Sequence, residues 1–290
     1  MKHLNQILLV VNPISGDKNK NRIIEKIESL TTQQNILLSV YKTTGEKDLE
    51  NIQEKIREQK PDRLISVGGD GTIKLCVEAL KDKKTSLAII PAGSANGMAT
   101  DLGIPEDIDK AIDIALREET KPIDVLDING ETSIHISDIG LNASLIKNYD
   151  EGSIRGKLGY AIKSIPTLID FKDPFRFKIN SNGTIKEGSA MMIGIANARK
   201  YGNGAIINPK GKLDDGKFEI LIIKTFQIKK IFETILDEIP MHDNFIEVIS
   251  TDSATIETAI PIPFQVDGEY ISEIDKVAVK VWSQQVNVVY

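Results

Sequence analysis

The sequence offers one cysteine, three histidines and no long apolar run. Cys76 alone excludes an intramolecular disulfide, and its apolar helical surroundings are typical of a buried, unreactive thiol. No segment approaches the roughly 18 uncharged apolar residues of a membrane-spanning helix. The first twelve residues hold a short apolar run without the cleavage pattern of a signal peptide, so we expect a strand there. A cytoplasmic protein is the expectation that follows.

An excess of positive charge is also missing. The 36 Lys and Arg residues are outnumbered by 42 Asp and Glu residues, which gives a formal net charge of -6. This balance argues against a general nucleic-acid-binding protein, because such domains are usually basic. The histidines, His3, His135 and His242, lie far apart without metal-ligand spacing, and we expect structural or surface roles for them.

The first part of the chain alternates short apolar runs with helical patterns. This alternation predicts a parallel sheet covered by helices on both faces. Ligands of such sheets bind at the carboxyl ends of the strands, so the loops there are the candidates for chemistry. We expect strands over 6–11, 36–41, 63–67 and 87–90, and helices over 20–30, 48–59, 72–81 and 108–117.

After Lys121-Pro122 the pattern changes to short strand-like segments separated by turns. Asn129-Gly130 and Asn182-Gly183 are strong hairpin signals between such segments. The change predicts an α/β domain over 1–122 and an all-β sandwich domain over 123–290. Strands of the second domain are expected over 124–128, 133–136, 175–179, 190–196, 218–223, 245–249, 254–257, 264–267 and 277–282. Helical patterns interrupt them over 157–171 and 228–239.

The run Gly68-Gly69-Asp70-Gly71-Thr72 follows an apolar strand and opens a helix. Its glycines let the backbone approach a phosphate closely, and the helix start offers unpaired N–H groups with partial positive charge. Asp70 is a candidate for holding a divalent cation or a water on that phosphate. The alternative is that Asp70 only caps the helix, but a simple cap does not require three glycines. The motif matches neither the P-loop nor the dinucleotide fingerprint.

Two more loops end predicted strands of the first domain. One is Asn12-Pro13-Ile14-Ser15-Gly16, and the other is Pro91-Ala92-Gly93-Ser94-Ala95-Asn96-Gly97. Each loop alone is typical of a connecting or capped turn. Ser94 and Asn96 carry groups that hydrogen-bond phosphate or ribose. Gly-rich loops after successive parallel strands are hard to explain without a bound phosphate, so the loops together predict a nucleotide site.

An acidic pair, Asp267-Gly268-Glu269, ends a predicted strand of the second domain. Two carboxylates beside a glycine suit a cation or a general base, because phosphoryl transfer to a hydroxyl requires proton acceptance and charge neutralisation. Alone, the motif is more typical of a surface Asp-Gly turn.

The loops together resemble one family, the diacylglycerol kinase catalytic-domain family of soluble bacterial diacylglycerol kinases and related lipid kinases, sphingosine kinases included. The resemblance runs in order over nearly the whole chain and includes the motifs at 138–143, 155–160 and 197–204. Two departures occur, Ser94 where many members have Thr and Asn203 within a usually more Gly-rich run. The resemblance implies an N-terminal α/β domain, a C-terminal β-sandwich domain and an active site in the cleft between them.

The resemblance implies an ATP-dependent lipid kinase that uses Mg²⁺, with conversion of diacylglycerol to phosphatidic acid as the family default. It places catalysis on Asp70, Asp267 and Glu269, with Glu269 accepting the lipid hydroxyl proton and Asp267 helping to bind Mg²⁺. A threonine after the second strand touches nucleotide in the family, which Thr44 matches best and Thr43 also fits. The implied nucleotide contacts are Asn12, Pro13, Ser15, Gly16, Thr44, Gly68, Gly69, Asp70, Gly71, Thr72, Gly93, Ser94 and Asn96.

Soluble bacterial members hold a structural Mg²⁺ in a loop with the pattern of 212–217. The resemblance places the Asp215 carboxylate and the main-chain carbonyls of Lys212 and Lys217 on that ion. Oxygen ligands of mixed side-chain and backbone origin suit a hard cation. We expect such an ion to order the second domain rather than take part directly in the chemistry.

Two other functions fit part of the pattern. An NAD kinase also carries a Gly-Gly-Asp-Gly-Thr loop and phosphorylates a hydroxyl, but the third loop and the acidic pair look like those of lipid kinases. A non-catalytic lipid or nucleotide sensor on the same fold does not need a base, so the joint presence of Asp70, Asp215, Asp267 and Glu269 argues against it. Several lipid hydroxyls stay open as acceptors, and a homodimer is an open expectation.

An insoluble substrate requires contact with a membrane surface. The stretch 147–178 carries more basic than acidic residues with apolar residues interleaved, so it is a candidate for peripheral contact with anionic lipid at the inner membrane face. The alternative is that its apolar face packs inward, as in most amphipathic helices. The basic residues of the stretch are Lys147, Arg155, Lys157, Lys163, Lys172, Arg176 and Lys178.

Overall fold

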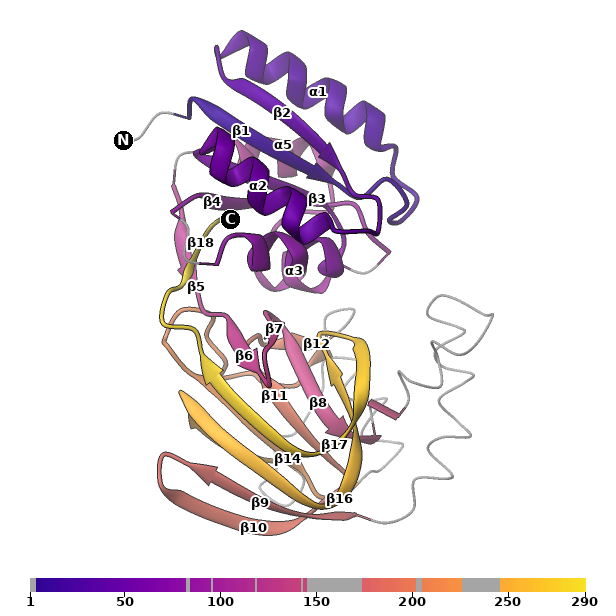
Figure 1. Cartoon of the computed structure of the whole chain (residues 1–290), viewed down its shortest axis with the longest axis vertical. Coiled ribbons are helices and arrows are strands. Elements are labelled where there is room, and N and C mark those ends of the chain that lie inside the picture. The colour runs from indigo at the N-terminus through magenta and orange to yellow at the C-terminus, as the bar shows by residue number, and fades with distance from the viewer. Residues whose placement is uncertain are drawn as a thin grey trace. The chain divides into compact units, whose positions relative to one another are not determined.

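The computed structural model (Figure 1) describes residues 4–81, 84–94, 96–117, 119–141, 143–144, 174–201, 205–225 and 246–290. The chain forms two compact units, one of Met1–Ile123 with Ser283–Tyr290 and one of Asp124–Trp282. The expected helices over 157–171 and 228–239 and the motif at 155–160 lie outside the described residues, as do residues 202–204 of the motif at 197–204. His3 and His242 also lie outside them.

The first unit is built on a six-stranded sheet in the order β2-β1-β3-β4-β18-β5. Its strands are β1 Gln6–Val11, β2 Leu37–Lys42, β3 Arg63–Gly68, β4 Ser86–Pro91, β5 Lys121–Ile123 and β18 Val286–Val289. All neighbours pair in parallel except β5, which runs antiparallel to β18. The parallel α/β architecture predicted from the sequence is confirmed.

Helices cover both faces of this sheet (Figure 1). They are α1 Lys20–Gln33, α2 Asp48–Gln59, α3 Asp70–Ala79, α4 Gly97–Asp101 and α5 Ile108–Ala115. Apolar residues of α1 and α5, such as Ile27 and Ile112, share a buried cluster with Leu9 and Ile65 of the strands. The opposite face is covered by α2 and α3, which contact β1 and β3. Burial of these alternating apolar side chains is the main force that holds the layers together.

The last strand departs from the expected domain boundary. The sequence predicted 123–290 as one β domain, but Ser283–Tyr290 lies in the first unit, where β18 sits between β4 and β5. Val288 pairs with Leu87 of β4, and Val286 with Ile123 of β5. Both valines are buried, so the apolar surface they bury explains the return of the chain to this sheet.

The second unit is a ten-stranded antiparallel sheet, which confirms the predicted antiparallel β sandwich. Its path is β15-β14-β11-β8-β16-β17-β6-β7, with β9 pairing β16 and β10 pairing β9. The bounds are β6 Leu126–Ile128, β7 Glu131–Ser133, β8 Ile136–Gly140, β9 Phe175–Ser181, β10 Thr184–Ala190, β11 Met192–Ala196, β14 Phe218–Ile223, β15 Ile246–Thr251, β16 Ser253–Val266 and β17 Glu269–Val281. A separate short pair is formed by β12 Lys200–Tyr201 and β13 Ala205–Ile206.

The long strand β16 lets this sheet close over its own core. The first half of β16 pairs with β9, and Phe264 and Gln265 in its second half pair with β8. Between the two halves the register against β17 shifts from Glu257 to Ile262. The enclosed core contains large side chains from several strands, among them Phe177 and Phe218.

Three hairpins of the second unit use the same turn chemistry. Asn129-Gly130 has φ values of 55° and 91°, and Asn182-Gly183 has 51° and 84°. Asp267-Gly268, between β16 and β17, has 50° and 90°. Two successive positive φ values fit a two-residue hairpin turn, which favours Asn or Asp followed by Gly. The acidic motif of the sequence is therefore a hairpin turn, whatever chemistry it carries.

Cys76 behaves as expected from its surroundings. It is fully buried in α3, and desolvation raises the pKa of its thiol to about 12, although the nearby Ser66 side chain opposes this effect. The thiol therefore stays protonated at neutral pH and is a poor nucleophile.

Candidate active site

Three loops leave neighbouring parallel strands at the same edge of the first sheet. The loop after β1 begins at Asn12, whose N–H donates to the Val67 carbonyl of β3 at 3.0 Å. The loop after β4 begins with Ala92, whose N–H donates to the Gly68 carbonyl at 2.8 Å. These bonds extend the sheet by one step and bring the first, second and third predicted loops together, at the edge where α/β sheets bind ligands.

The first and third loops are in direct contact at Gly16. A Cβ atom at Gly16 would lie 2.8 Å from the Ala92 carbonyl oxygen, and the glycine has a φ of +49°. The Ser15 hydroxyl donates to the carbonyls of Asn12 at 3.0 Å and of Ala92 at 3.3 Å. Both the close approach and the left-handed backbone require glycine at position 16. Ser15 therefore joins the two loops.

The second loop is packed against its own helix. A Cβ atom at Gly68 would lie 2.2 Å from the Thr72 hydroxyl oxygen, so only glycine fits there. Gly69 is the N-cap of α3, and the Gly69 carbonyl accepts from the Thr72 N–H at 3.0 Å. Because Gly69 has no side chain, it makes no capping hydrogen bond to the start of α3. A helix start without a capping side chain is suited to receive an anion.

Asp70 caps a different helix from the one it begins. Its Oδ2 accepts from the Gly97 N–H at 2.9 Å, and its Oδ1 from the Met98 N–H at 3.0 Å. Gly97 and Met98 are the first residues of α4. Asp70 therefore fastens the second loop to the third, a connection that the spacing in the sequence does not reveal. Its proposed part in catalysis stays a prediction.

Asn96 closes the third loop on itself. Its Oδ1 accepts from the Gly93 N–H at 3.0 Å, and its Nδ2 donates to the Gly93 carbonyl at 3.2 Å. Ser94, at the tip of this loop, is exposed. Of the two residues predicted to touch nucleotide here, Asn96 shapes the loop and Ser94 presents its hydroxyl to solvent.

The two threonines after β2 have different roles. The Thr43 N–H donates to the Val11 carbonyl at 2.9 Å and so continues the strand pairing. The Thr44 N–H donates to Asp48 Oδ1 at 2.9 Å. Burial alone would raise the pKa of Asp48, but hydrogen bonds from Tyr41, Thr44 and Gly45 outweigh it and hold the pKa below its ordinary value. The Asp48 carboxylate is therefore charged at neutral pH and fixes the turn that carries Thr44.

The acidic pair divides into a structural and an exposed carboxylate. Asp267 accepts from the Ser133 hydroxyl and the Ile134 N–H, both at 2.8 Å, and from the His135 N–H at 3.1 Å. Glu269 begins β17 and is exposed. Since three donors hold the Asp267 carboxylate against the connection between β7 and β8, this residue fixes the turn. Glu269 is the better placed of the two to meet a substrate.

Buried polar side chains support this turn from beneath. Gln265 accepts from the Gly268 N–H at 2.6 Å and donates to Asp138 Oδ2 at 2.5 Å. The Ser137 hydroxyl accepts from the Asp267 N–H at 3.3 Å. Gln265, Asp138 and Ser137 are fully buried. The sequence pattern did not predict that Gln265 and Asp138 belong to the acidic site, because these two residues are 127 positions apart in the chain.

The expected magnesium loop is a tight turn whose predicted ligand residues are exposed. Asp215 Oδ1 accepts from the Lys217 N–H at 3.1 Å, and the Gly216 N–H donates to Asp124 Oδ2 at 2.8 Å. Asp215, Lys212 and Lys217 are exposed. A carboxylate beside main-chain carbonyls is a donor set that suits Mg²⁺. Within the described part of the chain, no group of three or more His, Cys, Asp or Glu side chains could hold a metal.

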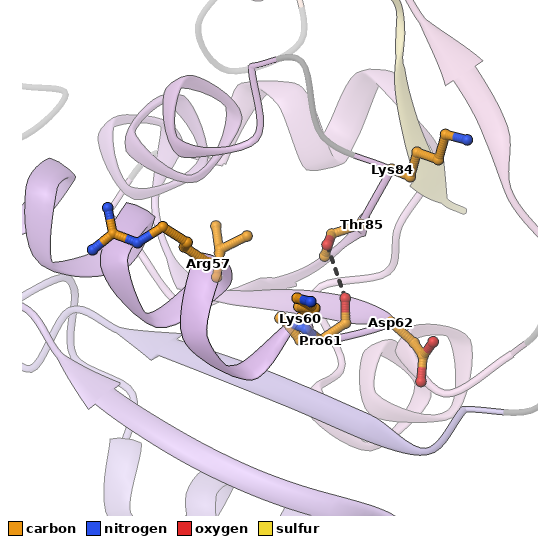
Figure 2. Close-up of a pocket in the computed structure, with 7 residues that line it drawn as sticks. Arg57, Lys60, Pro61, Asp62, Lys84 and Thr85 are labelled. Carbon is orange, nitrogen blue, oxygen red and sulfur yellow. Dashed lines mark hydrogen bonds between the residues drawn. The ribbon is translucent and has the colours of Figure 1, made fainter.

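A hollow of about 390 Å³ lies away from these loops, before the amino ends of β3 and β4. Arg57, Lys60 and Lys84 line it, and Figure 2 shows the Arg57 and Lys84 side chains pointing away from each other. Arg57 pairs with Glu54 at 3.2 Å. Arg57 and Lys60 lie at the end of α2, where basic residues favour the last helix carbonyls. Arg57 and Lys60 therefore have structural roles at the end of α2.

None of the helices in the described ranges is long and apolar enough to cross a membrane. Of the basic stretch proposed for membrane contact, residues 147–173 lie outside those ranges. Arg176 and Lys178 lie on the exposed side of β9, and Lys178 pairs with Glu187 at 3.6 Å.

Known proteins resemble both units of the chain. The diacylglycerol kinase catalytic domain matches residues 6–128, and the YegS C-terminal NAD kinase beta sandwich-like domain matches residues 136–290. The diacylglycerol kinase of Bacillus subtilis (strain 168) is 27% identical over 276 residues, 90% of this chain and 89% of that protein. The "Probable lipid kinase YegS" of Salmonella arizonae is 28% identical over 274 residues, 91% of this chain and 89% of that protein.

Solved structures of other proteins are also similar to this chain. A "putative diacylglycerol kinase" from Bacillus anthracis str. Sterne matches with a TM-score of 0.83 and 26% identity, over 100% of this chain and 98% of that one. An NAD kinase from Archaeoglobus fulgidus in complex with ATP matches with a TM-score of 0.51 at 11% identity, over 98% of this chain and 93% of that one, which shows a shared fold alone. The chain belongs to the lipid kinases that join a diacylglycerol kinase catalytic domain to a YegS-type β-sandwich domain.

Proposed function

We propose that this lipid kinase transfers the γ-phosphoryl group of ATP to the hydroxyl of a membrane lipid, with diacylglycerol as the first candidate. The proposal rests on one observation, namely that three loops are joined to one another at the same edge of the first sheet. There, Gly16 and Gly68 stand where no side chain fits, and Asp70 ties the second loop to the third. Phosphoryl transfer depends mainly on positioning and charge stabilisation, which a rigid set of loops provides.

Each part of the site has a role in this proposal. The three loops and the start of α3 together receive the phosphates, with Ser94 and Asn96 bonding phosphate or ribose, and Thr44 contacts the rest of the nucleotide. Glu269 accepts the proton of the lipid hydroxyl, and Asp267 holds the turn that carries Glu269. Mg²⁺ bound with ATP would neutralise the charge that develops on the phosphoryl oxygens. A second Mg²⁺ would lie on Asp215 and the carbonyls of Lys212 and Lys217.

The test is a transfer assay with γ-labelled ATP and Mg²⁺ over a panel of lipids in mixed micelles. We expect one product with labelled phosphate, formed fastest from diacylglycerol and identified by mass. A sphingoid base, monoacylglycerol, phosphatidylglycerol and undecaprenol form the rest of the panel, with NAD as the non-lipid comparison. Label found only on NAD would contradict a lipid acceptor, and label on another lipid would replace diacylglycerol with that lipid.

Mg²⁺ is expected to raise the Tm of the wild-type protein and to lose much of this effect in Asp215→Ala. A ligand that binds only the folded protein stabilises it by mass action, by about 2.7 kcal/mol at a hundred times its Kd. Differential scanning calorimetry with and without Mg²⁺ measures the shift. Asp214→Ala is the matched control, because it removes the neighbouring exposed carboxylate of the same loop. Equal Mg²⁺-induced shifts of Tm in Asp215→Ala and Asp214→Ala would show that Asp215 does not bind the ion.

Peripheral contact with the inner membrane face, a cytoplasmic location and a homodimer remain part of the proposal. They follow from the insolubility of the substrate class and from the resemblance.

A further inference from the structure

Lys20, which no motif of the sequence singled out, is a buried lysine beneath the first loop. It is 7% exposed and begins α1. Its ammonium group donates to the carbonyls of Ser15, of Lys18 at 3.0 Å and of Ala92 at 3.0 Å. An ammonium group has three donor hydrogens, and three carbonyls of two different loops accept them here. A lysine is rarely buried without such partners, so the arrangement fixes its position.

The carbonyls that accept hydrogen bonds from Lys20 also fix the direction of the N–H group in the same peptide unit. Every described peptide bond is trans, so a carbonyl and the N–H that follows it point in opposite directions. Because the Ser15 carbonyl turns toward Lys20, the Gly16 N–H points away from it. The Ala92 carbonyl likewise turns the Gly93 N–H outward, where Asn96 Oδ1 accepts it. Lys20 thereby orients the backbone donors of the loop edge.

The positive charge of Lys20 has a second effect. It lies directly behind the loop surface to which we assign the nucleotide phosphates, and burial from water weakens its screening. Lys18, which donates to the Pro91 carbonyl at 3.0 Å, adds another cation between the first loop and the end of β4. Geometry and charge therefore favour the same ligand, an anion on the outer side of the loops.

We propose that Lys20 is a positioning residue for nucleotide binding, because its ammonium group holds the first and third loops as one surface that receives the phosphates of ATP. The inference rests on the proposed function and deepens it. It assigns to Lys20 the relative placement of two loops that are more than 70 residues apart in the sequence. Lys20 itself contacts the loops and not the nucleotide.

The pH dependence of binding provides a readout that a purely structural role would not give. Burial, together with the nearby Lys18, lowers the pKa of Lys20 from its ordinary value of 10.5, although Asp17 opposes this shift. As pH rises through this lowered pKa, Lys20 loses its charge and one donor. ATP affinity should therefore fall on the alkaline side at a lower pH than an ordinary lysine would produce. In the Lys20→Arg variant, the guanidinium group keeps its charge throughout this range.

The experiment measures Kd for ATP with Mg²⁺ by calorimetry, over a range of pH, in the wild type and in Lys20→Met, Lys20→Arg and Lys26→Met. We expect Lys20→Met to raise Kd by roughly tenfold or more, because small displacements of a binding loop carry large losses. Lys26→Met changes a partly exposed lysine of the same helix, which pairs with Asp109 at 2.6 Å and lies outside the loops, so this variant should bind as the wild type does. Lys20→Arg should bind more tightly than Lys20→Met and lose the alkaline fall in affinity.

Several outcomes would overturn the inference. A folded Lys20→Met protein with wild-type Kd would do so, as would equal losses in Lys20→Met and Lys26→Met. If Lys20→Met does not fold, the wild type is compared with Lys20→Arg instead. An alkaline fall in ATP affinity that is identical in these two proteins would show that Lys20 is not the positioning residue. Absence of ATP binding in the wild type would instead overturn the proposed function itself, along with this inference. Calorimetry needs no lipid acceptor, so an error in the lipid leaves the result interpretable.

Discussion

Glu269→Gln is expected to bind ATP as the wild type does and to lose turnover by about 10² to 10⁴, the usual contribution of a general base. The amide has nearly the shape of the carboxylate but cannot accept the proton of the lipid hydroxyl. Glu269 is exposed at the start of β17, so the change opens no cavity and leaves the hairpin turn in place. The measurements are kcat with labelled ATP and saturating lipid, and Kd for ATP by calorimetry.

Glu273→Gln is the control for this variant. Glu273 lies four residues further along β17 and is also exposed, so its change removes the same charge from the same strand. Its turnover should stay within a factor of about two of the wild type, as for most surface substitutions. A loss of less than tenfold in Glu269→Gln, or an equal loss in both variants, would show that Glu269 is not the base.

Asp70→Asn is expected to lower kcat/KM for ATP by roughly 10² or more, the size of effect that follows from a misplaced binding group. The Asp70 carboxylate accepts two N–H groups of α4, and the amide offers only one acceptor oxygen. One N–H would then face the NH₂ group of Asn. We also expect a loss of stability of about 1–3 kcal/mol, the cost of leaving such a donor without its acceptor. Steady-state kinetics and thermal unfolding measure the two effects separately.

Asp107→Asn separates the loss of a helix cap from the loss of the site. Asp107 is the N-cap of α5 and accepts from the Lys110 N–H at 3.0 Å, at a position outside the three loops. Asn is about as good an N-cap as Asp, so little stability should be lost, and activity should not change. A folded Asp70→Asn protein with the kcat/KM of the wild type would show that Asp70 is not part of the proposed nucleotide site.

The repeating elements of the fold could be predicted because they depend on local patterns. The expected helix over 48–59 is α2, and the expected strand over 6–11 is β1. The expected strands over 254–257 and 264–267 are parts of one long strand, β16. Pro261 and Pro263 lie between the two parts, and proline is unfavourable within a strand because it has no N–H. Pro261 lies where the pairing with β17 is irregular, and Pro263 lies just beyond it, opposite Glu273.

The candidate site was predictable only where its residues are adjacent in sequence. The glycines of the second loop could be found because they stand together after an apolar strand, and the Asp267-Gly268 turn because its positive φ values favour Asp followed by Gly. The partners of these residues could not be found in this way. Lys20 bonds to Ala92, Ser133 to Asp267, and Asp124 to Gly216, and each pairing follows from strand order rather than spacing. The family resemblance implied roles for the motif residues but gave no sign of Lys20.

The position of β18 has a consequence for how the protein is made. A ribosome completes the strands β1 to β5 long before it reaches Val286–Val289, because the whole second unit is synthesised in between. Until then, β4 presents an open edge and β5 lacks its partner in the sheet. Open edges can pair with other chains, so the nascent first unit is exposed to misassociation for the time needed to translate residues 124–282. Folding of the first unit is thus expected to finish after synthesis of the β-sandwich rather than before it.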